Sequence, residues 1–161
     1  MNYQRFIGLI VMLTIFLLAF CIYRQEQTQS SEPTMNQLER NKHNVVAFYN
    51  LMFNENNPHE AVKKYVGATY IQHNPHVRNG KEGFIEYFTK MAAEFPNKHV
   101  YIKRVIAEDN YVVLHCLQVW PGDNNWAGID IFRLDTNGKI LEHWDVLQIV
   151  PENSENLNTM F

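Results

Sequence analysis

The periodicity of the sequence changes at Pro96, and this change limits most strongly how the chain can fold. Four β-prone runs follow this proline, at residues 99–108, 111–120, 126–134 and 139–150. Short turns join them, and consecutive strands joined by short turns run antiparallel. Asn137-Gly138 predicts a type I′ hairpin turn before the last run, because both residues tolerate a positive φ angle.

The residues before Pro96 repeat at helical spacing. Residues 36–54 predict a helix in which Val45, Tyr49 and Met52 recur at i, i+4 and i+7. Further helices are predicted at 58–66 and 80–95, with a short β-prone piece at 68–73 between them. Helices followed by an antiparallel meander indicate an α+β domain. Long twisted strands would curl round the helices into a cone, whose open end is a natural pocket.

The N-terminus carries a different signal. Residues 6–23 are apolar and uncharged, and as a helix they would reach about 27 Å, close to the hydrocarbon thickness of a bilayer. A cleaved secretory signal, an uncleaved membrane anchor and a lipid-modified Cys21 are the open alternatives. We therefore expect a signal or anchor segment at 1–24, a polar linker at 25–34 and the domain at 35–161, outside the cytoplasm. If the segment is not cleaved, residues 6–23 would anchor the protein in the membrane.

Composition and motifs argue against several classes of function. The formal net charge is −3 and the basic residues do not cluster, which disfavours a nucleic-acid partner. The two cysteines, Cys21 and Cys116, form neither a disulfide framework nor a zinc motif. Cys116 reads as a small buried hydrophobe. A glycine-rich phosphate loop and a Gly-x-Ser-x-Gly elbow are also absent from the sequence.

Several acids and histidines stand in segments that otherwise read as core. They are His73, His115, Asp130 and the group at 142–145. Burying a carboxylate without a partner costs several kcal/mol, so each needs a reason to be there. An acid in an apolar cavity, beside an imidazole, can move a proton at a carbon next to a carbonyl. Strand alternation puts Asp130 on one face with two apolar residues, and His115 on one face with three: Phe132 and Leu134 for Asp130; Val113, Leu117 and Val119 for His115.

Structural readings of the same residues stay open. His115 alone is more often a hydrogen-bonding strand residue than a functional one. Asp130 could pair with Arg133 or with a histidine. Residues 142–145 could form an alternating, salt-bridged surface, with the acid and tryptophan (Glu142, Trp144) on one face and the other pair (His143, Asp145) on the opposite face.

Two short spacings look like metal-ligand pairs, His73-x-x-His76 and His143-x-Asp145. Neither has a third ligand nearby in the sequence, and metal-binding motifs normally supply one. We therefore predict no metal and no cofactor.

Five segments, taken in order, resemble the SnoaL-like polyketide cyclase family. They are residues 70–75 (Tyr-Ile-Gln-His-Asn-Pro), the helix at 80–95, residues 104–108, residues 130–133 (Asp-Ile-Phe-Arg) and residues 138–146, which contain Glu-His-Trp-Asp. That family belongs to the cone-shaped nuclear transport factor 2-like superfold. The resemblance covers nearly all of residues 37–161 and implies the same α+β fold, with N-terminal helices packed in a curved antiparallel sheet.

The resemblance also implies a chemistry. SnoaL-type cyclases close a polyketide ring by intramolecular aldol condensation, with an aspartate as acid/base, histidines nearby, and no metal or cofactor. The matching catalytic residues would be Asp130, His115 and His73. The pocket wall would comprise Tyr70, Trp126, Phe132 and Trp144, with Asp145 orienting one of the histidines. The ligand would be a small apolar carbonyl compound, and the exposed sheet face would form a homodimer.

Three functions are consistent with these features. The first is a cofactor-independent enzyme that performs acid/base chemistry on a small carbonyl compound, of aldol-condensation, cyclase or isomerase type. The second is an exported, non-catalytic module that binds a small ligand. The third is an assembly domain that works through its sheet face. Since one fold supports many functions, the site has to distinguish them.

Overall fold

The computed structural model describes Phe20 and residues 37–161. Leu38–Phe161 forms a compact unit, which holds every strand of the sheet. Apart from Phe20, the predicted signal or anchor segment and the polar linker lie outside the described residues, so both stay predictions. Among the helices that are described, none is long and apolar enough to cross a membrane.

The helices agree with the periodicity of the sequence. Residues 37–49 are α-helical and continue directly into η1, a π-helical stretch at Asn50–Asn54. α2 spans Pro58–Tyr65, and the Asn57 side chain caps it by accepting a hydrogen bond from the backbone N–H of Glu60 at 3.2 Å. α3 spans Gly80–Glu94. All three predicted helices are confirmed, with ends that differ by a residue or two.

The π-helical stretch is a feature that the sequence did not predict. Its last residue, Asn54, pairs with the backbone of Val100 in two directions: the amide accepts from Val100 N at 2.7 Å and donates to Val100 O at 3.2 Å. The side chain thereby ties the end of the first helix to the first long strand. A single wide turn of this kind often lies at a functional site.

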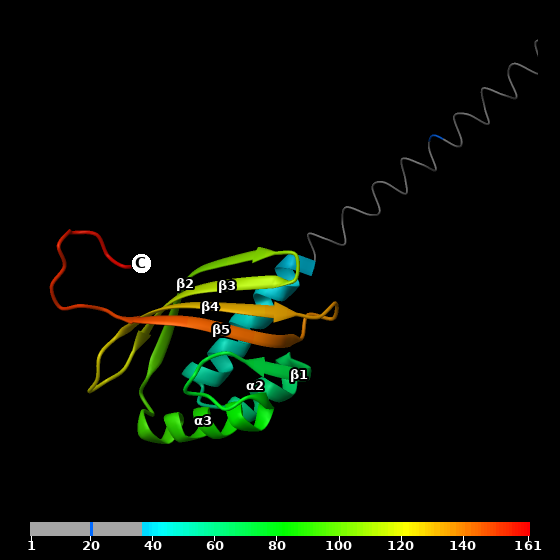
Figure 1. The fold of residues 1–161 in the computed structure, drawn as a ribbon, viewed down its shortest axis with the longest axis horizontal. Coiled ribbons are helices and arrows are strands. Elements are labelled where there is room, and N and C mark those ends of the chain that lie inside the picture. Colours follow the sequence, from blue (N-terminus) through cyan, green and yellow to red (C-terminus); the bar gives the residue numbers. More distant parts are fainter. Residues whose placement is uncertain (1–19, 21–36) are drawn as a thin grey trace, which may run out of the picture. The chain divides into compact units, whose positions relative to one another are not determined.

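Five strands form one mixed sheet in the order β1-β5-β4-β3-β2. Their bounds are Val66–Gln72 for β1, His99–Glu108 for β2, Tyr111–Val119 for β3, Trp126–Leu134 for β4 and Ile140–Ile149 for β5. The meander from β2 to β5 is antiparallel, as predicted. The expectation of a wholly antiparallel sheet is wrong at one edge, because β1 pairs parallel with β5. In Figure 1 the curved strands lie in front of the helical residues 37–54 (cyan). In the same view α3 lies at the bottom of the domain, lower than β1.

The hairpin between β4 and β5 also differs from the prediction. Of its two central residues only Gly138 has a positive φ, of 76°, so the turn is not type I′. Instead the Asp135 carboxylate accepts from the backbone N–H groups of Asn137 at 2.9 Å and Lys139 at 2.8 Å. A glycine in the left-handed region then returns the chain to β5, as in longer hairpin loops.

The core lies between the inner face of the sheet and the helices. Phe48 is central, because its ring lies 5.4 Å from that of Phe84 on α3 and 6.1 Å from that of Phe132 on β4. The apolar stripe of the first helix (Val45, Tyr49, Met52) is buried, as its spacing predicts. Two polar residues of the inner face, Asp130 and His143, are also buried. They indicate where the site lies.

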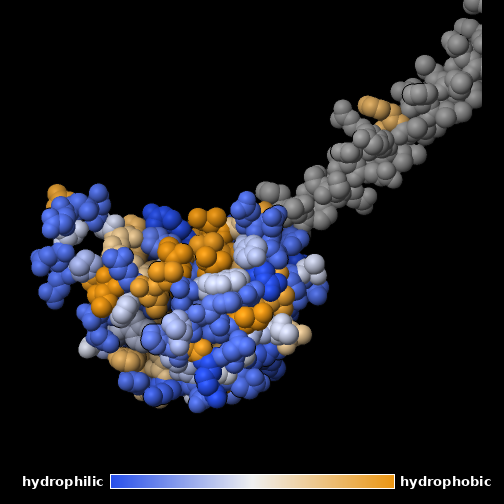
Figure 2. All heavy atoms as spheres, in the orientation of Figure 1, coloured by the Kyte–Doolittle hydropathy of each residue, from blue (hydrophilic) through white to orange (hydrophobic). Residues whose placement is uncertain are grey.

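Exposed apolar side chains gather on the outer face of the sheet. Ile106 is 60% exposed and Val146 74%, and Ile129 lies between them on β4 at 41%. Figure 2 shows hydrophobic residues gathered over the strands in this view. Contiguous exposed apolar side chains usually mark an interaction surface. The homodimer inferred from the family resemblance stays a prediction, and this face is where it would form.

A charge placed on the outer face should therefore break the dimer. We expect Val146→Glu to halve the molecular mass measured by size-exclusion chromatography with light scattering, because the carboxylate would lie unpaired in an apolar interface. The circular dichroism spectrum should not change, since Val146 is exposed. Leu157→Glu, in the exposed C-terminal segment, is the matched control. A wild-type protein that is monomeric at tens of micromolar would refute the prediction.

Candidate active site

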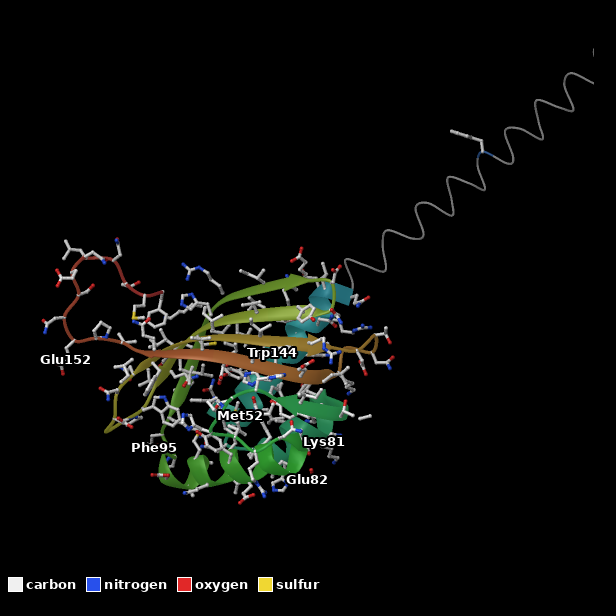
Figure 3. All side chains as sticks on the ribbon, in the orientation of Figure 1. Met52, Lys81, Glu82, Phe95, Trp144 and Glu152 are labelled. Atoms are coloured by element: carbon white, nitrogen blue, oxygen red, sulfur yellow. The ribbon has the colours of Figure 1, made fainter. Side chains whose placement is uncertain are left out.

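A cavity of about 830 Å³ opens between the inner face of the sheet and the helices. Its walls are mainly aromatic and come from the first helix, α3 and the sheet: Phe48, Tyr49, Phe53, Tyr70, Phe84, Tyr87, Phe88, Phe95, Trp120, Trp126 and Phe132. Met52 and Phe95, labelled in Figure 3, belong to this wall. A cavity of this size and lining is typical of a site for a small organic molecule.

Polar groups gather at one place on this wall. Gln72 is the last residue of β1 and Asn74 follows that strand, while His143 and Asp145 lie on β5. Asn74 donates from Nδ2 to Asp145 Oδ2 at 2.7 Å, which holds that carboxylate toward the cavity. Together these four residues form a patch that we call the polar floor.

Asp130 lies beneath the polar floor. It is fully buried, and it pairs with Asp145 across strands β4 and β5. Its Oδ1 accepts from the Tyr49 hydroxyl at 2.5 Å and lies 3.3 Å from His143 Nε2. Its Oδ2 has no hydrogen-bond partner among the described residues. Because Asp130 is enclosed by these groups, it can orient Tyr49 and His143 but does not face a ligand.

Burial controls the ionisation of three groups around Asp130. Burial raises the pKa of Tyr49 well above its ordinary value, and the Asp130 carboxylate adds to this effect. The pKa of Tyr70 is raised in the same way by burial and by Asp145 and Asp130. Both tyrosines are therefore neutral hydroxyl groups at physiological pH. Burial and Asp130 also raise the pKa of the Cys116 thiol, so Cys116 is not a thiolate nucleophile.

A family model for the SnoaL-like domain matches residues 45–143, more than half of the chain. The chain belongs to the SnoaL-like family. No curated protein matches it. The family and fold that the sequence motifs pointed to are thus confirmed, while the family match alone leaves the chemistry open.

Solved structures confirm the fold at low identity. A candidate polyketide cyclase from Acidithiobacillus ferrooxidans is 23% identical, over 67% of this chain and 87% of that one, with a TM-score of 0.58. AclR, a candidate hydroxylase from Streptomyces galilaeus, is 16% identical over 71% and 82% of the two chains, with a TM-score of 0.59. A nuclear transport factor 2-like protein from Cytophaga hutchinsonii is 20% identical over 67% and 89%, with a TM-score of 0.55.

The SnoaL-like domain brings only some of the predicted site residues together. Tyr70, Trp126, Phe132 and Asp145 line the cavity, and Asp130 lies directly behind it. His115 lies on the other face of the sheet. Leu114, its neighbour, is the residue that pairs with Asp130, so alternation turns His115 outward.

His115 therefore has surface partners. Arg104 Nη1 lies 3.0 Å from its Nδ1, and the ring of Phe161 stacks on the imidazole at 5.5 Å. The prediction that His115 reaches a pocket with Asp130 is wrong for this reason. Its apolar neighbours on the strand belong to the outer face, which is hydrophobic as well.

His73 and Trp144 also lie on the outer face. Their rings stack at 4.8 Å with an interplanar angle of 7°, and His73 Nε2 lies 2.9 Å from Glu142 Oε1. Arg133 Nε donates to the other oxygen of Glu142 at 2.7 Å. Figure 3 labels Trp144 on β5. Neither ring lines the cavity, so the predicted places of His73 and Trp144 in the pocket are wrong. The alternation of residues 142–145 does have both predicted faces, with Glu142 and Trp144 outside and His143 and Asp145 in the site.

Sequence reasoning missed four polar residues of the site: Tyr49, Gln72, Asn74 and His143. Tyr49 counted as one more member of a helical apolar stripe, and Gln72 stood beside the more conspicuous His73. His143 appeared in the alternation of residues 142–145 and in the His143-x-Asp145 spacing, but not among the predicted site residues. Those two patterns were the available signals. The alternation separates His143 from Glu142, but neither pattern shows which face of the strand is inside.

Three residues of β4 and β5, Asp130, His143 and Asp145, could also hold a cation. One ligand atom each from Asp130, His143 and Asp145 lies within 4.8 Å of the others. The third ligand that the His143-x-Asp145 spacing lacked thus comes from the neighbouring strand. An imidazole and two carboxylates suit a divalent metal ion, although the same groups equally suit a shared proton. The absence of a metal stays a prediction.

The ion-paired cluster of His73, Glu142 and Arg133 on the outer face predicts how the stability of the fold depends on pH. The hydrogen bond from His73 and the charge of Arg133 hold the pKa of Glu142 below its ordinary value. A carboxyl group with a lowered pKa in the folded protein stabilises it above the unfolded pKa, near 4.3, and this stabilisation is lost as the pH falls through the folded value. We expect Glu142→Gln to lower the free energy of unfolding by about 1 kcal/mol at pH 7.

Urea unfolding at a series of pH values measures this difference. The wild type and Glu142→Gln should converge below pH 4, where the carboxyl group becomes protonated. Glu152→Gln, in the exposed C-terminal segment, should match the wild type throughout. A constant difference between pH 7 and pH 3 would mean that Glu142 acts through packing rather than through its charge.

Proposed function

We propose that this SnoaL-like domain is an enzyme that transfers a proton at a carbon next to a carbonyl group, in an aldol-type ring closure or an isomerisation of a small apolar compound. The observation that carries the proposal is the position of Asp145: a carboxylate on the polar floor of an aromatic cavity, held by Asn74. The other acids that line the cavity, Glu94 and Asp123, are exposed. Asp145 is therefore the base in this proposal.

The polar floor can supply each step with groups of this chain. Asp145 takes a proton from the carbon, and the electron pair of the C–H bond moves onto the carbonyl oxygen as an enolate. His143 lies beside Asp145 and can stabilise that negative oxygen. In a ring closure the enolate carbon attacks a second carbonyl of the same molecule, a C–C bond forms, and the new alkoxide takes the proton back. Atoms and electrons balance without an oxidant or a reductant.

The aromatic walls serve this chemistry by excluding water. Removing water strengthens the interaction between the polar floor and a developing charge. The walls also hold a flat apolar molecule in one position, so that its carbonyl group reaches Asp145. Asp130, which the family resemblance pointed to as the catalytic acid, instead becomes a positioning residue, because it lies behind Tyr49 and His143.

Asp145→Asn should separate the two aspartates experimentally. The probe is 2-tetralone, a bicyclic apolar ketone, and the measurement is the rate of deuterium exchange at its α-carbon in heavy water by NMR. We expect Asp145→Asn to lower the catalysed rate by about 10²–10⁴-fold, the usual contribution of an acid/base group, with the fold retained. Undiminished exchange in this variant would remove Asp145 from the mechanism.

Asp130→Asn should act differently. It removes the charge that faces His143, so we expect a lower melting temperature as well as a lower rate, because an imidazole loses its buried partner. Tyr87→Phe, which changes a cavity-lining hydroxyl on α3, is the matched control for both variants. A rate loss in Asp145→Asn with an unchanged melting temperature, beside a loss of both in Asp130→Asn, would support the separate roles.

The alternative is an exported module that binds a small ligand without converting it. The eleven aromatic rings of the wall favour it, since they would hold an apolar ligand whether or not chemistry follows. This alternative predicts that the wild type binds 2-tetralone or a larger aromatic ketone by calorimetry but never accelerates exchange. Asp145→Asn would then leave the affinity nearly unchanged.

We also propose that the domain lies outside the cytoplasm, exported or anchored by residues 6–23. The support is the uncharged apolar run itself, which has the length of a bilayer crossing. Alkaline phosphatase fused after Phe161 in a bacterial host should be active, and it should lose activity when Leu9 and Leu17 are both replaced by Arg. Full phosphatase activity in the double variant would contradict an export role for this segment.

A further inference from the structure

Gln72, one of the four residues of the polar floor, makes hydrogen bonds that fix which way its amide points. The backbone N–H of Asn74 donates to Gln72 Oε1 at 3.0 Å, and a backbone N–H can only donate. Gln72 Nε2 correspondingly donates to the Tyr70 hydroxyl at 3.2 Å. The atom that Gln72 presents to its other neighbours is therefore a carbonyl oxygen, which only accepts.

That oxygen determines one nitrogen of His143. His143 Nδ1 lies 2.9 Å from Gln72 Oε1. Two acceptors at this distance would repel each other, so Nδ1 must carry a proton and donate it. Gln72 is held from two sides by β1 and the residues that follow it, so it cannot turn its amide without losing the bond to Asn74.

Asp130 determines the other nitrogen. His143 Nε2 lies 3.3 Å from Asp130 Oδ1, and the same oxygen already accepts from the Tyr49 hydroxyl. A carboxylate is an acceptor, so a proton has to lie on Nε2 for this contact to be attractive. Asp130 is fully buried, and a positive partner offsets part of the free-energy cost of burying a carboxylate.

We infer that Gln72 is a positioning residue that holds His143 protonated on both nitrogens, as the positive partner of the buried Asp130. The titratable groups that face this pair are Tyr49 from the first helix, Tyr70 from β1, Cys116 from β3 and Asp145 from β5. The first three are neutral because burial raises each pKa. Two carboxylates thus share one imidazolium.

The inference deepens the proposed function and, for its catalytic meaning, rests on it. An imidazolium donates hydrogen bonds and cannot take up a proton. Both N–H groups of His143 donate to Gln72 and Asp130, so His143 would stabilise the enolate oxygen through its positive charge, and Asp145 would remain as the base of the polar floor. The protonation state of His143 can nevertheless be measured without any substrate.

Nitrogen-15 NMR of the full chain, labelled at histidine, reads both ring nitrogens directly. His143→Gln identifies the His143 signals by their loss. At pH 7.5 we expect the wild type to show both nitrogens of His143 protonated. In Gln72→Leu the acceptor is gone, so Nδ1 should move to the unprotonated range while Nε2, facing Asp130, stays protonated. Gln72→Glu keeps an oxygen acceptor and should restore the wild-type pattern.

Two results would overturn the inference. One is a wild-type spectrum with an unprotonated Nε2, as expected if Asp130 held the proton or if a divalent cation lay among Asp130, His143 and Asp145. The other is a Gln72→Leu spectrum equal to that of the wild type. Tyr87→Phe, which also lines the cavity, should leave the His143 signals in place. Neither result depends on exchange at 2-tetralone, so failure of this inference is distinguishable from failure of the proposed function.

Discussion

The contact between His143 and Asp130 is the interaction on which the rest of the site depends. It places an imidazole and a carboxylate at 3.3 Å in the interior of a small domain, where neither would be tolerated alone. Tyr49 supplies the further hydrogen bond that a buried carboxylate needs, and Gln72 does the same for the imidazole. The aromatic core closes over this group and leaves one side open, and that side is the polar floor.

Strand register converts this buried pair into a site. The antiparallel pairing of β4 with β5 sets Asp130 opposite Asp145 and Phe132 opposite His143. One acid is therefore enclosed while its cross-strand neighbour faces the cavity. A shift of the register by one residue would turn the side chains of the shifted strand to the outer face, so the chemistry is as sensitive to the hairpin before β5 as to the residues themselves.

The sequence predicted the elements of the fold well and the site in part. Periodicity located the helices and strands because a buried stripe repeats along the chain, as with Val45 and Met52. It could not choose between two histidines, because both faces of this sheet are apolar: His115 has hydrophobic neighbours on the outer face, as His143 has on the inner one. The parallel edge was also missed, since no local pattern reports that β1 pairs with a strand near the other end of the domain.

That parallel edge has a consequence for how the protein matures. Gln72 and Asn74 meet their partners on β5 across 71 positions of sequence, and β5 is the last strand to leave the ribosome. Contacts of such long range form late in folding, because the chain between them must first be ordered. The helices and the first hairpins can therefore collapse into an apolar cup before any polar floor exists. The domain acquires its hydrophobic container early, and its chemistry only when synthesis of the domain is nearly complete.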